Sequence, residues 1–290
     1  MSGLLIPVLI LIDLLAGQGE TMVVRSYGRK YGDGGLLFNA IICLFASVFF
    51  FVTDKGGLCF PKELWGYGLV SCVMFATGFY TMYLALSTGS YVGSKMFSSF
   101  SSIIPIFYGI LILQETVSIP KWIGIILVFV TVILKVTEGI KGEDIKDASV
   151  SWYIYLLLSA VSNGFISVIT KMQQLRFDHM YDNEFMIISF LGSFAFLFVM
   201  ALIKERGKTK GILGKSILYG AGAGVLNGSK NFLNLIILLY LPISLSTPLR
   251  QGLGLIVGFI IATFLYKEKY TRRGIIALII GAVAVMLFRF

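Results

Sequence analysis

Long apolar runs recur along the whole 290-residue chain, and each is long enough to form a helix across a bilayer. Such a helix needs about 20 mostly apolar residues. Ten candidates are present, at 3–24, 35–53, 64–86, 92–113, 121–138, 151–174, 185–203, 216–240, 243–266 and 273–289. The loops between them are short and leave no room for a domain outside the membrane. The pattern predicts an all-α membrane protein with ten transmembrane helices.

The composition excludes several classes of protein. Apolar residues make up 57% of the chain and charged residues 13%, whereas a soluble domain carries about 25% charged residues. An ordinary soluble enzyme and a disordered chain are therefore excluded. The net charge of +9 comes from short basic runs between apolar segments, so no nucleic-acid partner is expected. Three cysteines without paired spacing and a single histidine predict no metal site, and no cofactor is expected.

The two halves of the sequence resemble each other. The longest polar connection, Glu138 to Val150, divides the chain into five spans and five spans. Residues 16–51 overlay residues 163–198 at an offset of 147, and residues 101–115 overlay residues 254–268 at an offset of 153. Because each repeat has an odd number of spans, the repeats would have opposite orientations, as in many secondary transporters. We expect repeats at 1–140 and 151–290, joined by a polar linker at 141–150.

Two sequence motifs extend this resemblance to a known family. The first is Ser102-Ile-Ile-Pro-Ile-Phe-Tyr-Gly-Ile-Leu-Ile-Leu-Gln-Glu115, followed by Trp122-Ile-Gly-Ile-Ile-Leu-Val. The second is Val257-Gly-Phe-Ile-Ile-Ala-Thr-Phe-Leu-Tyr-Lys-Glu268, followed by Arg273-Gly-Ile-Ile-Ala. Together they resemble the EamA-type repeat of the drug/metabolite transporter superfamily, although Gly258 replaces the proline at Pro105. The resemblance implies a ten-helix carrier with inverted repeats and a central cavity. It does not identify the substrate.

Polar residues lie at helical spacing in five of the predicted spans, the first, fourth, sixth, eighth and ninth. The clearest set is Asn227, Lys230, Asn231 and Asn234, at positions i, i+3, i+4 and i+7 of one helix. Such faces are costly against lipid, so they predict an aqueous cavity between the helices. The alternative is that the asparagines only join helices by hydrogen bonds. The fifth and tenth spans are almost wholly apolar and are expected at the periphery.

Charged residues inside the spans predict the charge of the cavity and the residues that bind the substrate. Lys95, Lys230 and Arg250 outnumber Asp13 and Glu20, so the cavity is expected to be cationic and to suit an organic anion. In the alternative, both acids form buried structural ion pairs with two of these cations. Asp13 and Glu20 are the predicted coupling or counter-ion residues. The predicted substrate contacts are Lys95, Asn163, Asn227, Lys230, Asn231, Asn234, Arg250, Gln251 and Tyr80.

These features predict a secondary transporter that moves a small polar organic metabolite, preferably an anion, by alternating access. Triose-phosphate and nucleotide-sugar carriers of the superfamily use basic residues on the fourth and ninth helices, where Lys95 and Arg250 lie. Alternatives are a proton-coupled exporter of cationic drugs or amines, which would use Glu20, and a lipid flippase. An alternative from another class is an intramembrane lipid-modifying enzyme, for which His179 beside Asp178 is the available acid/base group.

The expected partners are a small-molecule substrate, the lipid bilayer, and a proton or counter-substrate. The expected location is the plasma (inner) membrane. Fourteen basic residues lie in the odd-numbered loops and five in the even-numbered loops and termini. The positive-inside rule then places both termini outside, whereas the family's usual arrangement has them inside. A reporter fusion at Phe290 would decide between these orientations.

Overall fold

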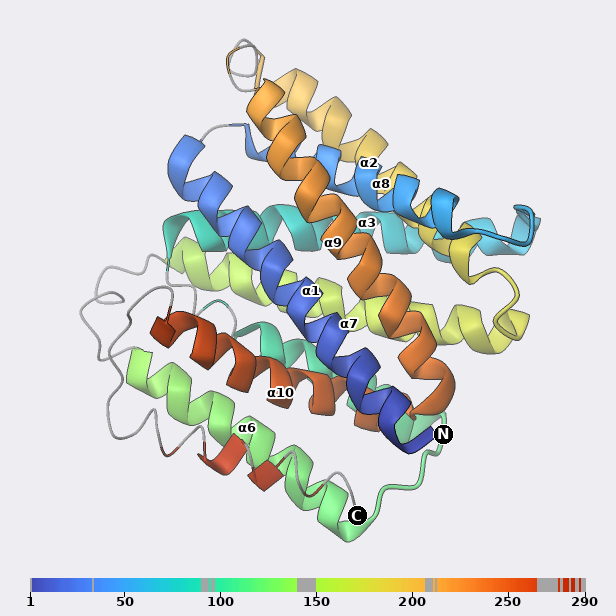
Figure 1. Cartoon of the computed structure of the whole chain (residues 1–290), viewed down its shortest axis with the longest axis vertical. Coiled ribbons are helices and arrows are strands. Elements are labelled where there is room, and N and C mark those ends of the chain that lie inside the picture. Colours follow the sequence, from blue (N-terminus) through green and yellow to red (C-terminus); the bar gives the residue numbers. More distant parts are fainter. Residues whose placement is uncertain are drawn as a thin grey trace.

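The computed structural model describes residues 2–32, 34–89, 94, 97–139, 150–206, 211, 213–264, 276, 279–281, 283–284 and 287. Within these ranges the chain is all-helical, and its long helices form one bundle (Figure 1). The helices are α1 (Ser2–Tyr31), α2 (Gly35–Thr53), α3 (Lys62–Thr88), α6 (Ile119–Gly139), α7 (Val150–Phe177), α8 (Asp182–Lys204), α9 (Leu213–Tyr240) and α10 (Ile243–Phe264). Three short segments lie between α3 and α6, namely η1 (Ser99–Ser102), α5 (Ile103–Phe107) and η2 (Tyr108–Ile112).

The helices agree closely with the predicted spans. The first nine ranges each coincide with described helical segments, while the tenth, 273–289, lies mostly outside the described residues. Among the described residues, five helices are long and apolar enough to cross a membrane, namely α1, α2, α3, α7 and α8. The all-helical class is therefore confirmed, and the count of ten spans stays a prediction.

The fourth predicted span differs from a continuous α-helix. It is divided into η1, α5 and η2, with Pro105 inside α5. Because proline has no N–H to donate to the preceding turn, it disturbs the regular ladder of hydrogen bonds. Past it the helix widens, and the Leu113 N–H donates to the carbonyl of Tyr108, five residues back, at 3.2 Å. An irregular course of this kind is expected near a proline inside a span.

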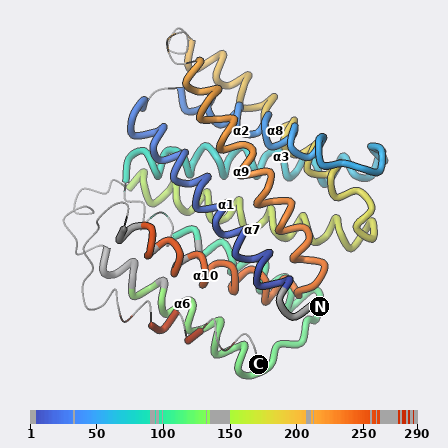
Figure 2. The backbone as a smooth tube through the Cα atoms, in the orientation of Figure 1, coloured from blue at the N-terminus to red at the C-terminus, as the bar shows by residue number. Residues whose placement is uncertain are grey.

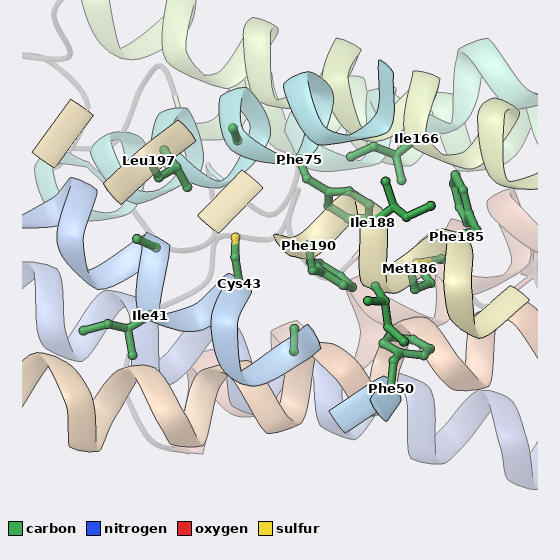
Figure 3. Close-up of a cluster of buried hydrophobic side chains, with 14 of the residues drawn as sticks. Ile41, Cys43, Phe50, Phe75, Ile166, Phe185, Met186, Ile188, Phe190 and Leu197 are labelled. Carbon is green, nitrogen blue, oxygen red and sulfur yellow. The ribbon is translucent and has the colours of Figure 1, made fainter. Parts of the chain in front are cut away.

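The main hydrophobic core lies between α2, α3, α7 and α8. Phe50 of α2 and Phe185 and Phe190 of α8 are fully buried within it (Figure 3). Phe50 and Phe190 stack with their ring centroids 6.0 Å apart. Around this core α2 packs against α8 and α9, α1 lies along α9, and α3 lies along α7 and α8. The tube in Figure 2 shows how these long helices cross one another.

Small residues let α9 approach α2 closely. A Cβ added at Gly224 would lie 2.6 Å from the carbonyl oxygen of Ile42, and one at Gly220 would lie 2.6 Å from a methyl carbon of Ile41. By contrast, a Cβ at Gly222 would meet nothing within 4 Å. The Gly220-Ala-Gly222-Ala-Gly224 run is thus a helix-packing face, as its position in a span predicts, and not a phosphate-binding loop.

Apolar side chains cover the outside of the bundle. On α6, which lies at its edge (Figure 1), Trp122, Ile126 and Ile133 are exposed, whereas Thr131 is buried. The Thr131 hydroxyl donates to the Leu127 carbonyl, so the helix shows lipid no unpaired polar group on this turn. An apolar surface of this kind is suited to a bilayer rather than to water.

Carboxylates hold two helix N-termini from distant parts of the chain. Glu115 accepts hydrogen bonds from the backbone N–H groups of Ile243 and Ser244 at the start of α10, at 3.0 and 2.9 Å. Glu205, after α8, accepts from those of Leu36 and Leu37 at the start of α2. The first N–H groups of a helix have no partner within it, so these carboxylates satisfy them and favour the helix dipole.

Candidate functional site

A cavity of about 220 Å³ lies within the helix bundle. Its wall is formed by α1, α3, α7, α9 and α10 together with the short segments of the fourth span. The polar faces predicted on separate spans therefore meet around one space. The predicted residues in its wall are Asp13, Glu20, Asn163, Asn227, Lys230, Asn231, Asn234, Arg250 and Gln251.

Two predicted site residues are not part of this wall as described. Tyr80 of α3 packs against the main hydrophobic cluster and lies about 100° around the helix from Phe79, which does line the wall. Lys95 lies outside the described residues. The wall also contains residues that the polar pattern did not single out, among them Gln18, Thr21, Phe75, Phe79 and Met82.

Arg250 and Asp13 form a two-point ion pair between α10 and α1. The Arg250 Nε donates to Asp13 Oδ2 at 2.8 Å, and a terminal nitrogen donates to Asp13 Oδ1 at 2.7 Å. The other terminal nitrogen donates to Asn234 Oδ1 on α9. The Asp13 side chain is 2% exposed and that of Arg250 19%. A guanidinium matches a carboxylate in this parallel geometry, so a nearly buried charge is fully compensated.

Glu20 and Lys230 form a second ion pair, between α1 and α9. The Lys230 Nζ donates to Glu20 Oε2 at 2.6 Å, and Asn227 Nδ2 donates to Glu20 Oε1 at 2.7 Å. Gly17 makes room for this contact, because a Cβ there would lie 3.2 Å from Lys230 Cδ. Asn231 in turn donates to Asn227 Oδ1 at 2.9 Å. Asn227, Lys230 and Asn231 of α9 are thus tied to α1 through the Glu20 carboxylate, whereas Asn234 accepts from Arg250.

The charges of the described wall balance. Asp13 and Glu20 are the counter-ions of Arg250 and Lys230, the arrangement that the sequence left open as the structural alternative. The predicted excess of positive charge depended on Lys95, which is not described. For the residues that can be placed, the wall offers two neutral ion pairs with amides beside them.

Other amides of the wall connect α1 and α10 to their neighbours, and one bonds within α7. Gln251 Nε2 donates to the Ser101 hydroxyl at 3.2 Å, which ties α10 to the fourth span. Gln18 Nε2 donates to the Gly254 carbonyl at 3.0 Å and ties α1 to α10. Asn163 donates to the Ser159 carbonyl within α7 at 2.8 Å. Asn163 therefore lines the cavity without joining either ion pair.

His179 lies apart from this cavity, in the connection between α7 and α8. Its Nδ1 is 4.0 Å from Asp182 Oδ2. Both His179 and its neighbour Asp178 have positive φ angles, 63° and 49°, which places them in a tight turn. The histidine that an enzymatic function would use is thus not among the residues of the cavity wall.

A comparison with protein families matches part of the chain. Residues 19–137 match the model of the EamA-like transporter family. The match bears out the predicted resemblance over these residues. Several described helices are long and apolar enough to cross a membrane, which makes the protein an integral, multi-pass membrane protein, and the matched family consists of transporters of the drug/metabolite type. The match begins within α1 and ends within α6, so it covers most of the first predicted repeat.

Comparison with solved structures extends the likeness over the whole chain. One crystal structure, described without a protein name, is similar with a TM-score of 0.69 and 11% sequence identity. The alignment covers 97% of this chain and 98% of the other. At this identity the likeness concerns the fold alone. No curated protein has a significant match to the sequence.

Proposed function

We propose that the chain is a secondary transporter that carries a small polar organic metabolite by alternating access. The cavity with two ion pairs between α1 and the helices α9 and α10 carries this proposal. Polar and charged groups inside a membrane protein are expensive and typically mark a transport pathway. The plasma (inner) membrane is the proposed location.

Two repeats of five helices, at 1–140 and 151–290, are part of the proposal. Neighbouring pairs correspond when each helix is exchanged for its counterpart: α1 lies along α9 as α7 lies along α3, and α2 contacts α9 as α8 contacts α3. This correspondence supports inverted repeats, between which a transporter places its substrate. The tenth span is proposed from sequence, because residues 265–275 and most of those after them are not described.

Alternating access would use the ion pairs as exchangeable contacts. An anionic substrate would take the place of Asp13 on Arg250, or of Glu20 on Lys230, because a guanidinium or ammonium binds carboxylate and phosphate alike. The displaced carboxylate would then need a proton or a new donor, since a buried unpaired charge is costly. This exchange links substrate binding to movement of α1 and makes Asp13 and Glu20 candidates for proton coupling.

Transport is tested with purified protein in liposomes. Labelled pyruvate, glycerol 3-phosphate and methylamine are offered to vesicles that contain the same unlabelled compound or buffer alone. We expect saturable exchange of an anion, and its loss in the Arg250→Ala and Lys95→Ala variants. Exchange of methylamine alone would support the cation exporter instead. Exchange no faster than in protein-free vesicles for all three compounds, together with movement of a fluorescent phospholipid between leaflets, would support the lipid flippase.

A further inference from the structure

One wall of the cavity is apolar and comes from a single face of α3. Phe75, Phe79 and Met82 line the cavity at positions i, i+4 and i+7. Side chains at this spacing lie on the same side of a helix. Ile166 of α7 adds another apolar group to the wall. The cavity therefore has an apolar surface that none of the ion-pair chemistry uses.

The aromatic part of this wall is held in place from behind. Phe75 and Phe79 stack with ring centroids 5.7 Å apart and an angle of 23° between the rings. Phe190 of α8 lies against Phe75, with centroids 4.6 Å apart. Phe190 itself is fully buried in the main core. Rings that are fixed by packing lose little freedom when a ligand contacts them, so this wall is preorganised.

The polar wall on α9 occupies the matching positions of the other half. A constant offset of 152 relates the two sets of wall residues, close to the offset of 153 found for the fourth and ninth spans. α1 packs against both α3 and α9, so the two faces belong to different walls. The matched residues are Phe75 with Asn227, Phe79 with Asn231, and Met82 with Asn234. Equivalent places in the two halves thus carry opposite chemistry.

The size of the cavity limits what can lie between these walls. A buried apolar cavity of about 150 Å³ holds a benzene molecule. The space here is about 220 Å³, which is enough for one six-membered ring and a short polar group. Because the described charges are paired, the polar group would bind by hydrogen bonds to the amides or by exchange with an ion-pair partner.

We propose that the cavity selects a solute with one compact polar head and one compact apolar or aromatic body, and that Phe79 and Met82 determine the preference for the body. This inference rests on the proposed transport function and narrows its substrate class. The head faces the amides and ion pairs of α1, α9 and α10, and the body lies against α3. A solute that is polar on all sides would leave the α3 wall without a partner.

Matched pairs of small probes test this proposal. Acetate and phenylacetate share a carboxylate head, ethylamine and phenethylamine share an ammonium head, and each pair differs by one phenyl group. Binding to purified protein in detergent is measured by calorimetry. Burial of a phenyl group predicts at least about tenfold tighter binding for the aromatic member of the pair whose head is accepted. The ratio of the affinities of the aromatic and the small probe falls at least about threefold in Phe79→Ala and in Met82→Ala. In Phe79→Leu this ratio is largely kept.

Phe196→Ala is the matched control. Phe196 is a phenylalanine on α8 with 52% of its surface exposed, and it is not among the cavity residues. Partition of aromatic probes into detergent would be the same in all variants, and melting temperatures show whether each variant is folded. Equal affinities within both pairs, no binding of any probe, or an aromatic preference that Phe79→Ala and Met82→Ala leave intact would overturn the inference. Binding with the expected ratio but without flux into liposomes would instead overturn the transport function.

Discussion

At the scale of single residues, the ion pair between Asp13 and Arg250 joins two helices through a nearly buried charge. Asp13 is 2% exposed and all its described polar contacts are with Arg250. A buried pair of this kind adds little net stability over an apolar pair of the same shape, but the loss of one partner leaves a buried charge. The pair therefore constrains α1 and α10 to stay together unless another group takes over one of the charges.

We expect a single variant that removes one partner of this ion pair to be much less stable than a double variant that replaces both partners. Arg250→Ala removes the partner of Asp13 and should lower the free energy of unfolding by about 3–5 kcal/mol. The combination of Asp13→Asn with Arg250→Gln should recover most of this loss, because two amides remain able to bond and no charge is unpaired. The melting temperatures of the unmodified protein, Arg250→Ala and the double variant in detergent measure the effect. A double variant as unstable as Arg250→Ala alone would show that the ion pair is not the cause.

At the scale of whole elements, the glycine face of α9 determines how closely α9 and α2 can pack. Gly220 and Gly224 lie against the backbone or Cβ-branched side chains of α2, whereas Gly222 on the same helix meets no other group within 4 Å. In a membrane, where lipid is as apolar as a leucine side chain, helices associate largely through such close backbone contact. The cavity residues of α9 depend on this contact for their position relative to α1.

A matched pair of substitutions on α9 tests the packing face. Gly224→Leu should separate α9 from α2, because even its Cβ would lie 2.6 Å from a backbone oxygen. We expect loss of the monodisperse, folded protein on size-exclusion chromatography and a strongly lowered melting temperature. Gly222→Leu makes the same change two residues earlier, on a face of α9 where an added Cβ meets nothing within 4 Å. It should leave both measurements near those of the unmodified protein. Similar behaviour of the two variants would contradict a specific role for the Gly224 contact.

The N-terminus of α10 offers a second prediction at this scale. Glu115→Ala removes the acceptor for two backbone N–H groups at the start of α10. The loss of a helix cap typically costs about 0.5–2 kcal/mol, and α10 carries Arg250 and Gln251 about two turns further on. We expect a lower melting temperature and weaker substrate exchange. Glu63→Ala, at an exposed glutamate in the first turn of α3, is the control and should change neither.

At the scale of the whole molecule, sequence periodicity predicted the helices and their polar faces better than their contacts. Lys230 and Asn231 belong to a polar face that a period of 3.6 residues makes visible in any apolar span. Periodicity does not say which helices are neighbours, so the pairing of Lys230 with Glu20 remained one of two alternatives. Phe79 escaped notice because an apolar cavity residue looks like a lipid-facing one in sequence. Gly17 is explained only once the path of the Lys230 side chain is known.

The orientation of the molecule in the membrane is still a prediction, and a native cysteine can test it. Cys59 is exposed, while Cys43 and Cys72 are buried. It lies in the connection between α2 and α3, which meets the start of α8 through the hydrogen bond from the Cys59 N–H to Glu184. In Figure 1 the α2–α3 and α7–α8 connections lie at the same side of the bundle. A label on Cys59 therefore reports which side of the membrane both connections face.

The distribution of basic residues predicts the outcome of that labelling. Fourteen of them lie in odd-numbered loops, and the positive-inside rule places these loops in the cytoplasm. The α2–α3 connection is an even-numbered loop, so Cys59 should face the outside. A membrane-impermeant maleimide should then label intact cells, and Cys59→Ser should abolish the signal. Labelling only after the membrane is permeabilised would instead place both termini inside, and the basic loops would then lie on the outer surface against the charge rule.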